Sequence, residues 1–304
     1  MPNPFDIDNS EAYLRWREQK LVNTITNARD LLVEINDPNM LTTTEYSALI
    51  GCIRRSNMAV YVTHAEMDEA KLKRFNAQLG LRRLDANWLA DEQGISRIAV
   101  SSENNQRQTY IPFTDHAIKW HTDGYYNPAQ RQIHGMVLHC VRCAGTGGEN
   151  RVMDHEIAYL LLRDTNPDFI RALSAPDAMT IPERVDEFDG VREAQTGPVF
   201  SVNARGTLHM RYTARTRSIE WRQDETTLAA VAQLEQILAS TSPHIHQLKL
   251  EHGMGLVCNN ILHDRSSFSD DSALPRLLYR ARYLDRITVP MTKDGYMRNP
   301  HFAF

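Results

Sequence analysis

Hydrophobic positions in the first eighty residues recur mostly every three to four residues, the spacing of one helix face. This spacing predicts helices over residues 10–35, 42–55 and 66–79. The first is expected to end before Pro38, because a proline disfavours helical backbone in the residue that precedes it. Residues 58–63, rich in β-branched and aromatic side chains, predict a short strand between the second and third helices.

From about residue 95 the pattern changes to short β-prone runs separated by turn residues. Helical spacing returns only over residues 156–173 and 225–239. Successive short strands are typical of an antiparallel sandwich or barrel rather than of a parallel sheet. The predicted strands cover residues 95–102, 108–113, 133–141, 197–202, 207–213, 244–250, 255–262 and 276–284.

These elements predict an α+β fold with a mainly β core, in which helices pack around a β-barrel. The chain contains no Pro/Ser/Gly-rich linker and no repeat that would divide it. We therefore expect one domain over residues 1–304. Residues 1–56 are expected to form a helical N-terminal extension, and residues 95–290 the barrel core with helical insertions.

Composition and charge narrow the function classes. The 304 residues include 34 Lys+Arg and 38 Asp+Glu, a net charge of −4 that offers no general attraction for nucleic acid or an acidic membrane surface. No apolar run approaches the ~18 residues of a membrane span. The first twenty residues are charged throughout, so no signal peptide is expected. Four cysteines are too few for a disulfide framework, and the protein is expected in the cytoplasm.

The first candidate for chemistry is the segment from Trp120 to Gly124, which contains His121 and Asp123. Side chains two residues apart on an extended strand project from the same face, so both could reach one metal ion. Histidine two residues from an acid is common, and by itself this pattern is more typical of a surface strand with ordinary polar residues.

A second histidine makes the metal hypothesis more specific. His263 follows the apolar run of residues 255–258 and the pair Asn259 and Asn260. A lone histidine there is usually a hydrogen-bonded structural residue. Together with His121 and Asp123, however, it completes two histidines and one carboxylate, the facial triad of non-haem Fe(II) oxygenases.

An arginine-rich strand follows at residues 275–284. Strand periodicity places Arg276, Leu278, Arg280 and Arg282 on one face. A guanidinium there can hold a carboxylate through two parallel hydrogen bonds, which lysine cannot do. The alternative is a solvated basic edge, but Leu278 on the same face favours at least partial burial.

The order of these motifs resembles the taurine dioxygenase / gamma-butyrobetaine hydroxylase superfamily. The motifs are His-x-Asp, Gly-Gly-Glu-Asn at residues 147–150, His-Asp-Arg-Ser-Ser-Phe at 263–268, and the arginine strand. The resemblance covers about residues 95–290. It implies a double-stranded β-helix, or jelly roll, with Fe(II) and the cosubstrate 2-oxoglutarate. It also implies conversion of 2-oxoglutarate and O₂ to succinate and CO₂, coupled to hydroxylation of an unactivated C–H bond.

The resemblance also implies roles for single residues. His121, Asp123 and His263 would bind and activate the iron, and Arg276 would bind the distal carboxylate of 2-oxoglutarate. Arg280 would face the primary substrate, although the roles of Arg276 and Arg280 could be exchanged.

Two positions depart from the family pattern. Asn150 stands where the family often has a threonine that also contacts the cosubstrate, and an asparagine can donate the same hydrogen bond through its amide. Asp264 stands where glycine is commoner, and we interpret it as a tolerated turn variant.

The substrate is expected to be a small anionic or zwitterionic metabolite. Tyr125, Tyr126, Tyr212 and Arg215 are the further candidates for binding it, because they follow the His-x-Asp motif or lie where the superfamily often places substrate-facing residues. The same tyrosines with Trp221 could instead form an aromatic cage for a quaternary ammonium. Arg215 and Arg217 could also be surface charges paired with Glu220.

Other hypotheses remain open. Cys140 and Cys143 form a Cys-x-x-Cys motif, but it lacks the second pair or histidines of a zinc site and the strand–helix unit of a thioredoxin-like site. A non-catalytic 2-oxoglutarate- or metal-binding regulatory protein would have lost a ligand or the cosubstrate arginine. A metal-dependent hydrolase would not need the arginine strand. A homo-oligomer is possible.

Overall fold

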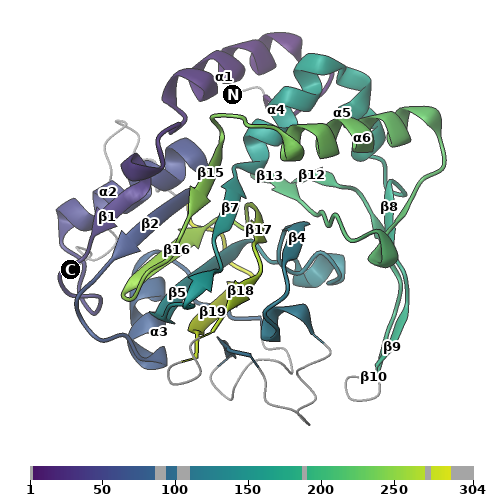
Figure 1. The fold of residues 1–304 in the computed structure, drawn as a ribbon. Coiled ribbons are helices and arrows are strands. Elements are labelled where there is room, and N and C mark those ends of the chain that lie inside the picture. Colours follow the sequence, from purple (N-terminus) through teal and green to yellow (C-terminus); the bar gives the residue numbers. More distant parts are fainter. Residues whose placement is uncertain (1–2, 86–93, 101–109, 187–189, 271–274, 289–304) are drawn as a thin grey trace.

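The computed structural model describes residues 3–85, 94–100, 110–186, 190–270 and 275–288. It is a mixed fold of helices and sheets, as the sequence predicts (Figure 1). The α-helices are α1 (Ser10–Asn23), α2 (Thr43–Ser56), α3 (Glu69–Gln78), α4 (His155–Thr165), α5 (Pro167–Leu173) and α6 (Glu225–Ala239).

Six strands form the larger sheet, in the order β1-β2-β16-β5-β19-β3, and four form the second, in the order β15-β7-β17-β4. The strands of the larger sheet are β1 (Leu32–Glu34), β2 (Met58–Val62), β3 (Ile95–Ile98), β5 (Gly135–Arg142), β16 (Met254–Cys258) and β19 (Leu277–Tyr283). Those of the second are β4 (Ile118–His121), β7 (Asn150–Met153), β15 (Ile245–Leu248) and β17 (Leu262–Arg265).

Smaller sheets complete the described part of the chain. They comprise β6 (Thr146–Gly147) with β18 (Phe268–Ser269), β9 (Arg184–Asp186) with β10 (Gly190–Arg192), β12 (Phe200–Val202) with β13 (Leu208–Met210), and β8 (Met179–Ile181) between β11 (Gln195–Gly197) and β14 (Glu220–Trp221).

The predicted first helix is too long. It ends at Asn23, and residues 32–34 instead form β1, which pairs in parallel with β2. The reason is visible in the burial, which alternates: Leu31, Val33 and Ile35 are buried, whereas residues 32 and 34 are exposed. Period-two burial is that of a strand, and the apolar spacing alone did not separate the two periods.

Three further predictions differ in detail. The predicted strand over residues 255–262 is two strands, because the chain leaves the larger sheet after β16 and enters the second sheet as β17. The predicted helix over residues 156–173 breaks at Asn166, which caps α5 ahead of Pro167. Of the predicted strand over 108–113, residues 108–109 lie outside the described part, and Ile111–Phe113 form a short 3-10 turn.

Two hydrophobic cores lie on either side of this arrangement. One joins α2 and α3 to the larger sheet, around residues such as Leu49, Phe75 and Val137. The other joins α4, α5 and α6, which gather at one end of the molecule with α1, to β12 and β13 (Figure 1). The second sheet contributes to both cores, since Val152 of β7 belongs to the first, and Met153 of β7 and Leu262 of β17 belong to the second.

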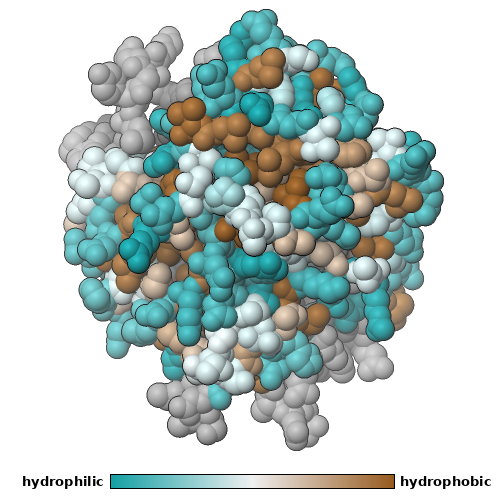
Figure 2. Space-filling model, turned by 45° about the horizontal axis from the view of Figure 1, so that its top comes forward, coloured by the Kyte–Doolittle hydropathy of each residue, from teal (hydrophilic) through white to brown (hydrophobic). Residues whose placement is uncertain are grey.

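The surface is largely hydrophilic, with hydrophobic residues gathered in one area of the face shown in Figure 2. Large exposed apolar side chains include Leu14 and Val22 of α1 and Leu228 of α6. Apolar surface of this kind is compatible with packing against a second copy, and the homo-oligomer stays a prediction. Within the described residues, no helix combines the length and apolar character needed to cross a membrane.

Candidate active site

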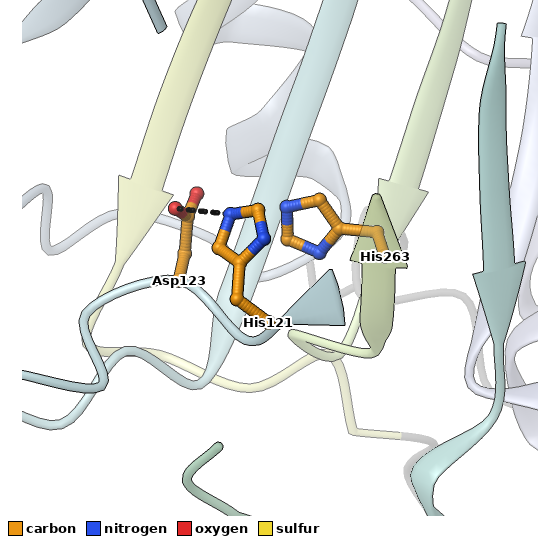
Figure 3. A group of neighbouring side chains, drawn as sticks. All are labelled: His121, Asp123 and His263. Atoms are coloured by element: carbon orange, nitrogen blue, oxygen red, sulfur yellow. Dashed lines mark ion pairs between the residues drawn. The ribbon is translucent and has the colours of Figure 1, made fainter. Parts of the chain in front are cut away.

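Three side chains that the sequence singles out for metal binding meet in the structure. His121, Asp123 and His263 each offer one ligand atom, and these atoms lie within 4.8 Å of one another. The two imidazole rings face each other with centroids 4.2 Å apart, and the Asp123 carboxylate lies beside His121 (Figure 3). The described residues contain no other group of three or more His, Cys, Asp or Glu side chains with this geometry.

The strand pairing explains how residues so distant in sequence meet. β17 and β4 are antiparallel neighbours in the second sheet, and His263 lies directly opposite His121. The sequence predicts that Asp123 lies on the same strand as His121, but β4 ends at His121 and Asp123 lies in the following turn. Gly124 allows that turn, since its φ is +66° and a Cβ there would lie 2.4 Å from Ile133.

Both histidines hold Nδ1 against a backbone carbonyl. His121 Nδ1 lies 2.9 Å from the Lys119 carbonyl, and His263 Nδ1 lies 3.0 Å from the Ile261 carbonyl. A carbonyl oxygen only accepts, so each Nδ1 carries a proton, and Nε2 is the nitrogen available to bind a metal ion. Burial, and next the charge of His263, lowers the pKa of His121 to about 3, so its imidazole is neutral at physiological pH.

Asp123 is the anionic member of the set. Burial opposes its ionisation, but the charges of Arg280 and Arg282 outweigh this effect and hold the pKa of Asp123 below its ordinary value. Arg280 Nη1 lies 3.3 Å from Asp123 Oδ1, whereas Oδ2 is buried without a hydrogen-bond partner in the described structure. Two imidazole nitrogens and a carboxylate oxygen with a free lone pair therefore fit Fe(II).

Asn260 fixes the backbone of Asp123, a contact that sequence reasoning missed. Its side chain accepts a hydrogen bond from Asp123 N at 2.8 Å and donates to the carbonyls of Asp123 at 2.9 Å and Ile133 at 2.6 Å. Asn260 is buried and has φ +49°, a left-handed conformation that asparagine tolerates better than most residues. Since it lies three residues before His263, it ties two of the three candidate ligands together.

A pocket between the two sheets contains two of the three candidate ligands together with the predicted arginines. Arg276, Leu278 and Arg280 line it, so the face predicted from strand periodicity is the one turned toward the histidines. The second sheet contributes His121 and His263. Arg282, further along the strand, pairs instead with Asp85 at 2.7 Å and donates a hydrogen bond to the hydroxyl of Tyr126.

Arg276 is a buried cation whose guanidinium forms no ion pair with any described residue, although Asp270 accepts a hydrogen bond from its backbone N–H at 3.0 Å. Its residue is 5% exposed, and burial lowers its pKa. Its guanidinium lies 4.8 Å from the centre of the Phe268 ring and makes no ion pair or hydrogen bond with another described residue. Burying an unpaired charge is costly, and an incoming carboxylate would offset that cost.

Asn150 and Asp264 also line the pocket. The Asn150 amide donates to the Asp264 carbonyl at 2.7 Å, which leaves its second N–H for another acceptor. The sequence suggested that Asp264 is a turn residue. The structure shows instead that it lies within β17. Its carboxylate accepts hydrogen bonds from the backbone N–H and the guanidinium of Arg151 on β7, so it joins these two strands.

Arg265 is a further pocket residue that the sequence did not reveal. Its guanidinium donates to the carbonyls of Pro112, Thr114 and His116, the segment that leads into β4. The guanidinium also lies 4.9 Å from the centre of the Phe268 ring, on which Arg276 stacks as well. Only the tertiary structure shows that this residue holds the approach to His121.

The expected substrate residues divide into two groups. Tyr125 contacts His121 edge-on at 6.5 Å between ring centres, and Tyr126 contacts Tyr125 at 5.2 Å. Tyr212, in contrast, is fully buried and packs on Trp221 at 6.3 Å. No ring contact joins the two pairs in the described structure. Arg215 is half-buried, and neither it nor Arg217 forms an ion pair with Glu220 among the described residues.

Comparison with known families gives a match over most of the chain. The family model described as Taurine catabolism dioxygenase TauD, TfdA family matches residues 22–282. This range includes the three candidate ligands and all the predicted pocket residues.

Among curated proteins, the chain is 30% identical over 171 residues to a uridine-5'-phosphate dioxygenase of Amycolatopsis sp. The match covers 55% of this chain and 60% of the relative, so the chain spans about three fifths of that relative's length.

Among solved structures, the fold resembles asparagine oxygenase in complex with Fe(II), hydroxyasparagine and succinate, with a TM-score of 0.57, 17% identity and 80% of each chain covered. It also resembles a taurine dioxygenase from Burkholderia xenovorans, with a TM-score of 0.55, 16% identity, and 87% of this chain and 91% of that one covered. At such low identity these likenesses show the fold.

Proposed function

The chain belongs to the TauD, TfdA family, whose members are non-haem Fe(II)- and 2-oxoglutarate-dependent dioxygenases, and we propose that it hydroxylates a C–H bond of a small anionic or zwitterionic metabolite. One observation carries this proposal. Arg276, a buried cation with no ion pair among the described residues, lies in the same pocket as His121 and His263, so a metal and a carboxylate could bind there together.

In this proposal His121, Asp123 and His263 hold the iron, which when bound supplies the oxidation of 2-oxoglutarate with O₂ to succinate and CO₂ and of the substrate C–H bond. The Nδ1–H groups of the histidines stay bonded to backbone carbonyls, so both rings keep their orientation. Arg276 binds the distal carboxylate of 2-oxoglutarate through a charge-assisted hydrogen-bonded pair, and Asn150 adds a donor. Leu138 and Leu278 keep water away from this end of the pocket.

Arg280 is proposed to contact both the metal ligand Asp123 and the primary substrate. Its contact with Asp123 holds that carboxylate in the ionised form needed for metal binding, and its position on the pocket face lets it also meet an anionic substrate. Tyr125 and Tyr126 are proposed to line the entrance, and Tyr212 and Arg215 stay predictions as substrate contacts. The names of the relatives suggest nucleotides and amino acids as test substrates: one is a uridine-5'-phosphate dioxygenase and another an asparagine oxygenase.

We also propose that the larger and the second sheet are the two halves of a jelly roll, as in the family. The pocket takes residues from both sheets, among them Leu278 of β19 and His263 of β17. A site assembled in this way requires both sheets to fold as one unit, which supports the expectation of one domain over residues 1–304.

The proposal is tested by measuring succinate release from 2-oxoglutarate with Fe(II), ascorbate and O₂ against a panel of uridine 5'-phosphate, amino acids and taurine. We expect slow release without primary substrate and faster release with one member of the panel or a related compound. Binding of 2-oxoglutarate without any succinate release would favour a non-catalytic regulatory protein, and no binding of 2-oxoglutarate would contradict the proposed dioxygenase function.

A further inference from the structure

Two cysteines at the end of β5 have no part in the proposed reaction but lie next to the pocket. The sulfur atoms of Cys140 and Cys143 are 3.9 Å apart. Cys140 is 1% exposed, whereas Cys143 is half-buried. Since the described residues contain no group of three or more metal-ligating side chains besides the His–Asp–His set, this pair lacks the further ligands of a zinc site.

The backbone that carries the two cysteines is fastened to the start of β19. Cys140 lies opposite Leu278, and Arg142 lies opposite Leu277, with an irregularity in the register between them. Arg142 Nε also donates a hydrogen bond of 2.9 Å to the carbonyl of Pro275. The segment from Cys140 to Arg142 is therefore bonded to residues on both sides of Arg276.

The pair and the guanidinium are also neighbours around Gly148. Gly148 is buried between the two segments. A Cβ placed on it would lie 3.6 Å from the Ala144 side chain and 3.6 Å from Arg276 Nε. Ala144 directly follows Cys143, so the side chain next to the pair and the guanidinium lie on the same side of this glycine, and both cysteines are close enough to Arg276 to influence its charge. Leu278, opposite Cys140, lines the pocket as well.

We propose that Cys140 and Cys143 are a redox-sensitive pair whose oxidation to a disulfide by a peroxide weakens the binding of 2-oxoglutarate. The inference rests on the proposed role of Arg276 as the cosubstrate ligand. A disulfide requires an S–S distance of about 2.05 Å, so the two sulfurs, now 3.9 Å apart, must approach, and in this proposal the segment that carries them moves with them. Such a movement would reach Arg276, because the segment is bonded to the residues before and after it.

The chemistry balances with one hydrogen peroxide per pair. The thiolate of the more exposed Cys143 attacks one peroxide oxygen, the O–O bond breaks, and a sulfenic acid and hydroxide form. The sulfur of Cys140 then attacks the Cys143 sulfur, the S–S bond forms, and the sulfenic oxygen leaves as water. Two thiols lose two electrons and two protons in total, and the peroxide becomes two molecules of water. Burial, and next the neighbouring Cys143, raises the pKa of Cys140 to about 12, so Cys140 is the slower partner.

The test compares reduced and peroxide-treated protein after removal of the peroxide. Alkylation and intact mass count the free thiols, and anaerobic calorimetry with Mn(II) in place of Fe(II) measures the dissociation constant of 2-oxoglutarate. We expect the treated protein to lose two thiols and to bind 2-oxoglutarate at least about tenfold more weakly, the effect of misplacing one charge-assisted contact. Dithiothreitol is expected to restore both values.

Cys143→Ser should remove the response to peroxide, whereas Cys52→Ser, which changes a buried cysteine on α2 away from the pocket, should leave it intact. Failure to form the disulfide, or a disulfide with unchanged binding, overturns the inference and leaves the proposed function standing. If the reduced protein itself does not bind 2-oxoglutarate, the proposed function fails, and this inference fails with it.

Discussion

Replacement of Asn260 tests whether the geometry of the metal site depends on one buried side chain. Asn260→Ala removes three hydrogen bonds, one to the N–H of Asp123 and two to the carbonyls of Asp123 and Ile133. At about 1 kcal/mol for each bond the loss is about 3 kcal/mol. Alanine at φ +49° adds about 1 kcal/mol of backbone strain. We therefore expect the free energy of unfolding to fall by about 4 kcal/mol.

The informative readout is the affinity of the folded protein for Fe(II). It is measured anaerobically, at low temperature and in buffer without denaturant. Removing a residue that orients metal ligands typically weakens metal binding 10- to 100-fold, and we expect a loss in that range. Asn260→Gly separates the cost of backbone strain from the cost of the lost hydrogen bonds, because glycine relieves the strain but does not replace the hydrogen bonds.

A matched control is Asn57, which is also buried, also has a positive φ (55°) and also bonds through its side chain, but to Asp154, Asn259 and Arg286. Asn57→Ala should destabilise the fold with little change in metal affinity. If Asn260→Ala binds Fe(II) as tightly as Asn57→Ala, the reasoning that Asn260 positions Asp123 is refuted.

Three further predictions concern single side chains. His121→Ala or His263→Ala should abolish turnover and weaken Fe(II) binding, while Cys143→Ala under reducing conditions stays near wild type; a histidine variant that keeps its activity would mean that the metal ligands are misassigned. Arg276→Ala should raise the dissociation constant of 2-oxoglutarate roughly tenfold or more, because a charge-assisted contact is lost. Arg280→Ala should act mainly on the binding of the primary substrate and of the metal. A larger effect of Arg280→Ala on 2-oxoglutarate binding would reverse the two roles. Lys20→Met should lower the free energy of unfolding by about 3 kcal/mol, because it removes the cation that Asp154 and Glu156 share. The value of kcat should not change, since these residues lie outside the pocket. Urea unfolding measures the first effect and steady-state kinetics the second.

The sequence was informative where local pattern and chemistry coincide. The helix predicted over residues 225–239 has those bounds in the structure, because Asp224 caps it and its apolar face is continuous. Two histidines and one carboxylate, taken together with the resemblance to the family, select the group that the structure brings together, His121, Asp123 and His263. Strand periodicity also predicted correctly that Arg276, Leu278 and Arg280 share a face.

Features that depend on neighbours distant in sequence were missed. Asp264 reads as a variant turn residue in isolation, and only the pairing of β17 with β7 reveals its partner Arg151. No role for Asn260 follows from the sequence, because nothing in it shows that the backbone of Asp123 will lie against this side chain. Residues 31–35 were assigned to a helix, since a short apolar run fits both periods until its pairing partner is known.

Anaerobic binding of 2-oxoglutarate to the Fe(II)-loaded protein tests the central claim most directly. The account predicts saturable binding with one 2-oxoglutarate per iron, a metal-to-ligand charge-transfer absorption that appears on addition of 2-oxoglutarate, and loss of both in His263→Ala. Wild-type protein that binds Fe(II) but shows neither 2-oxoglutarate binding nor this absorption would contradict it.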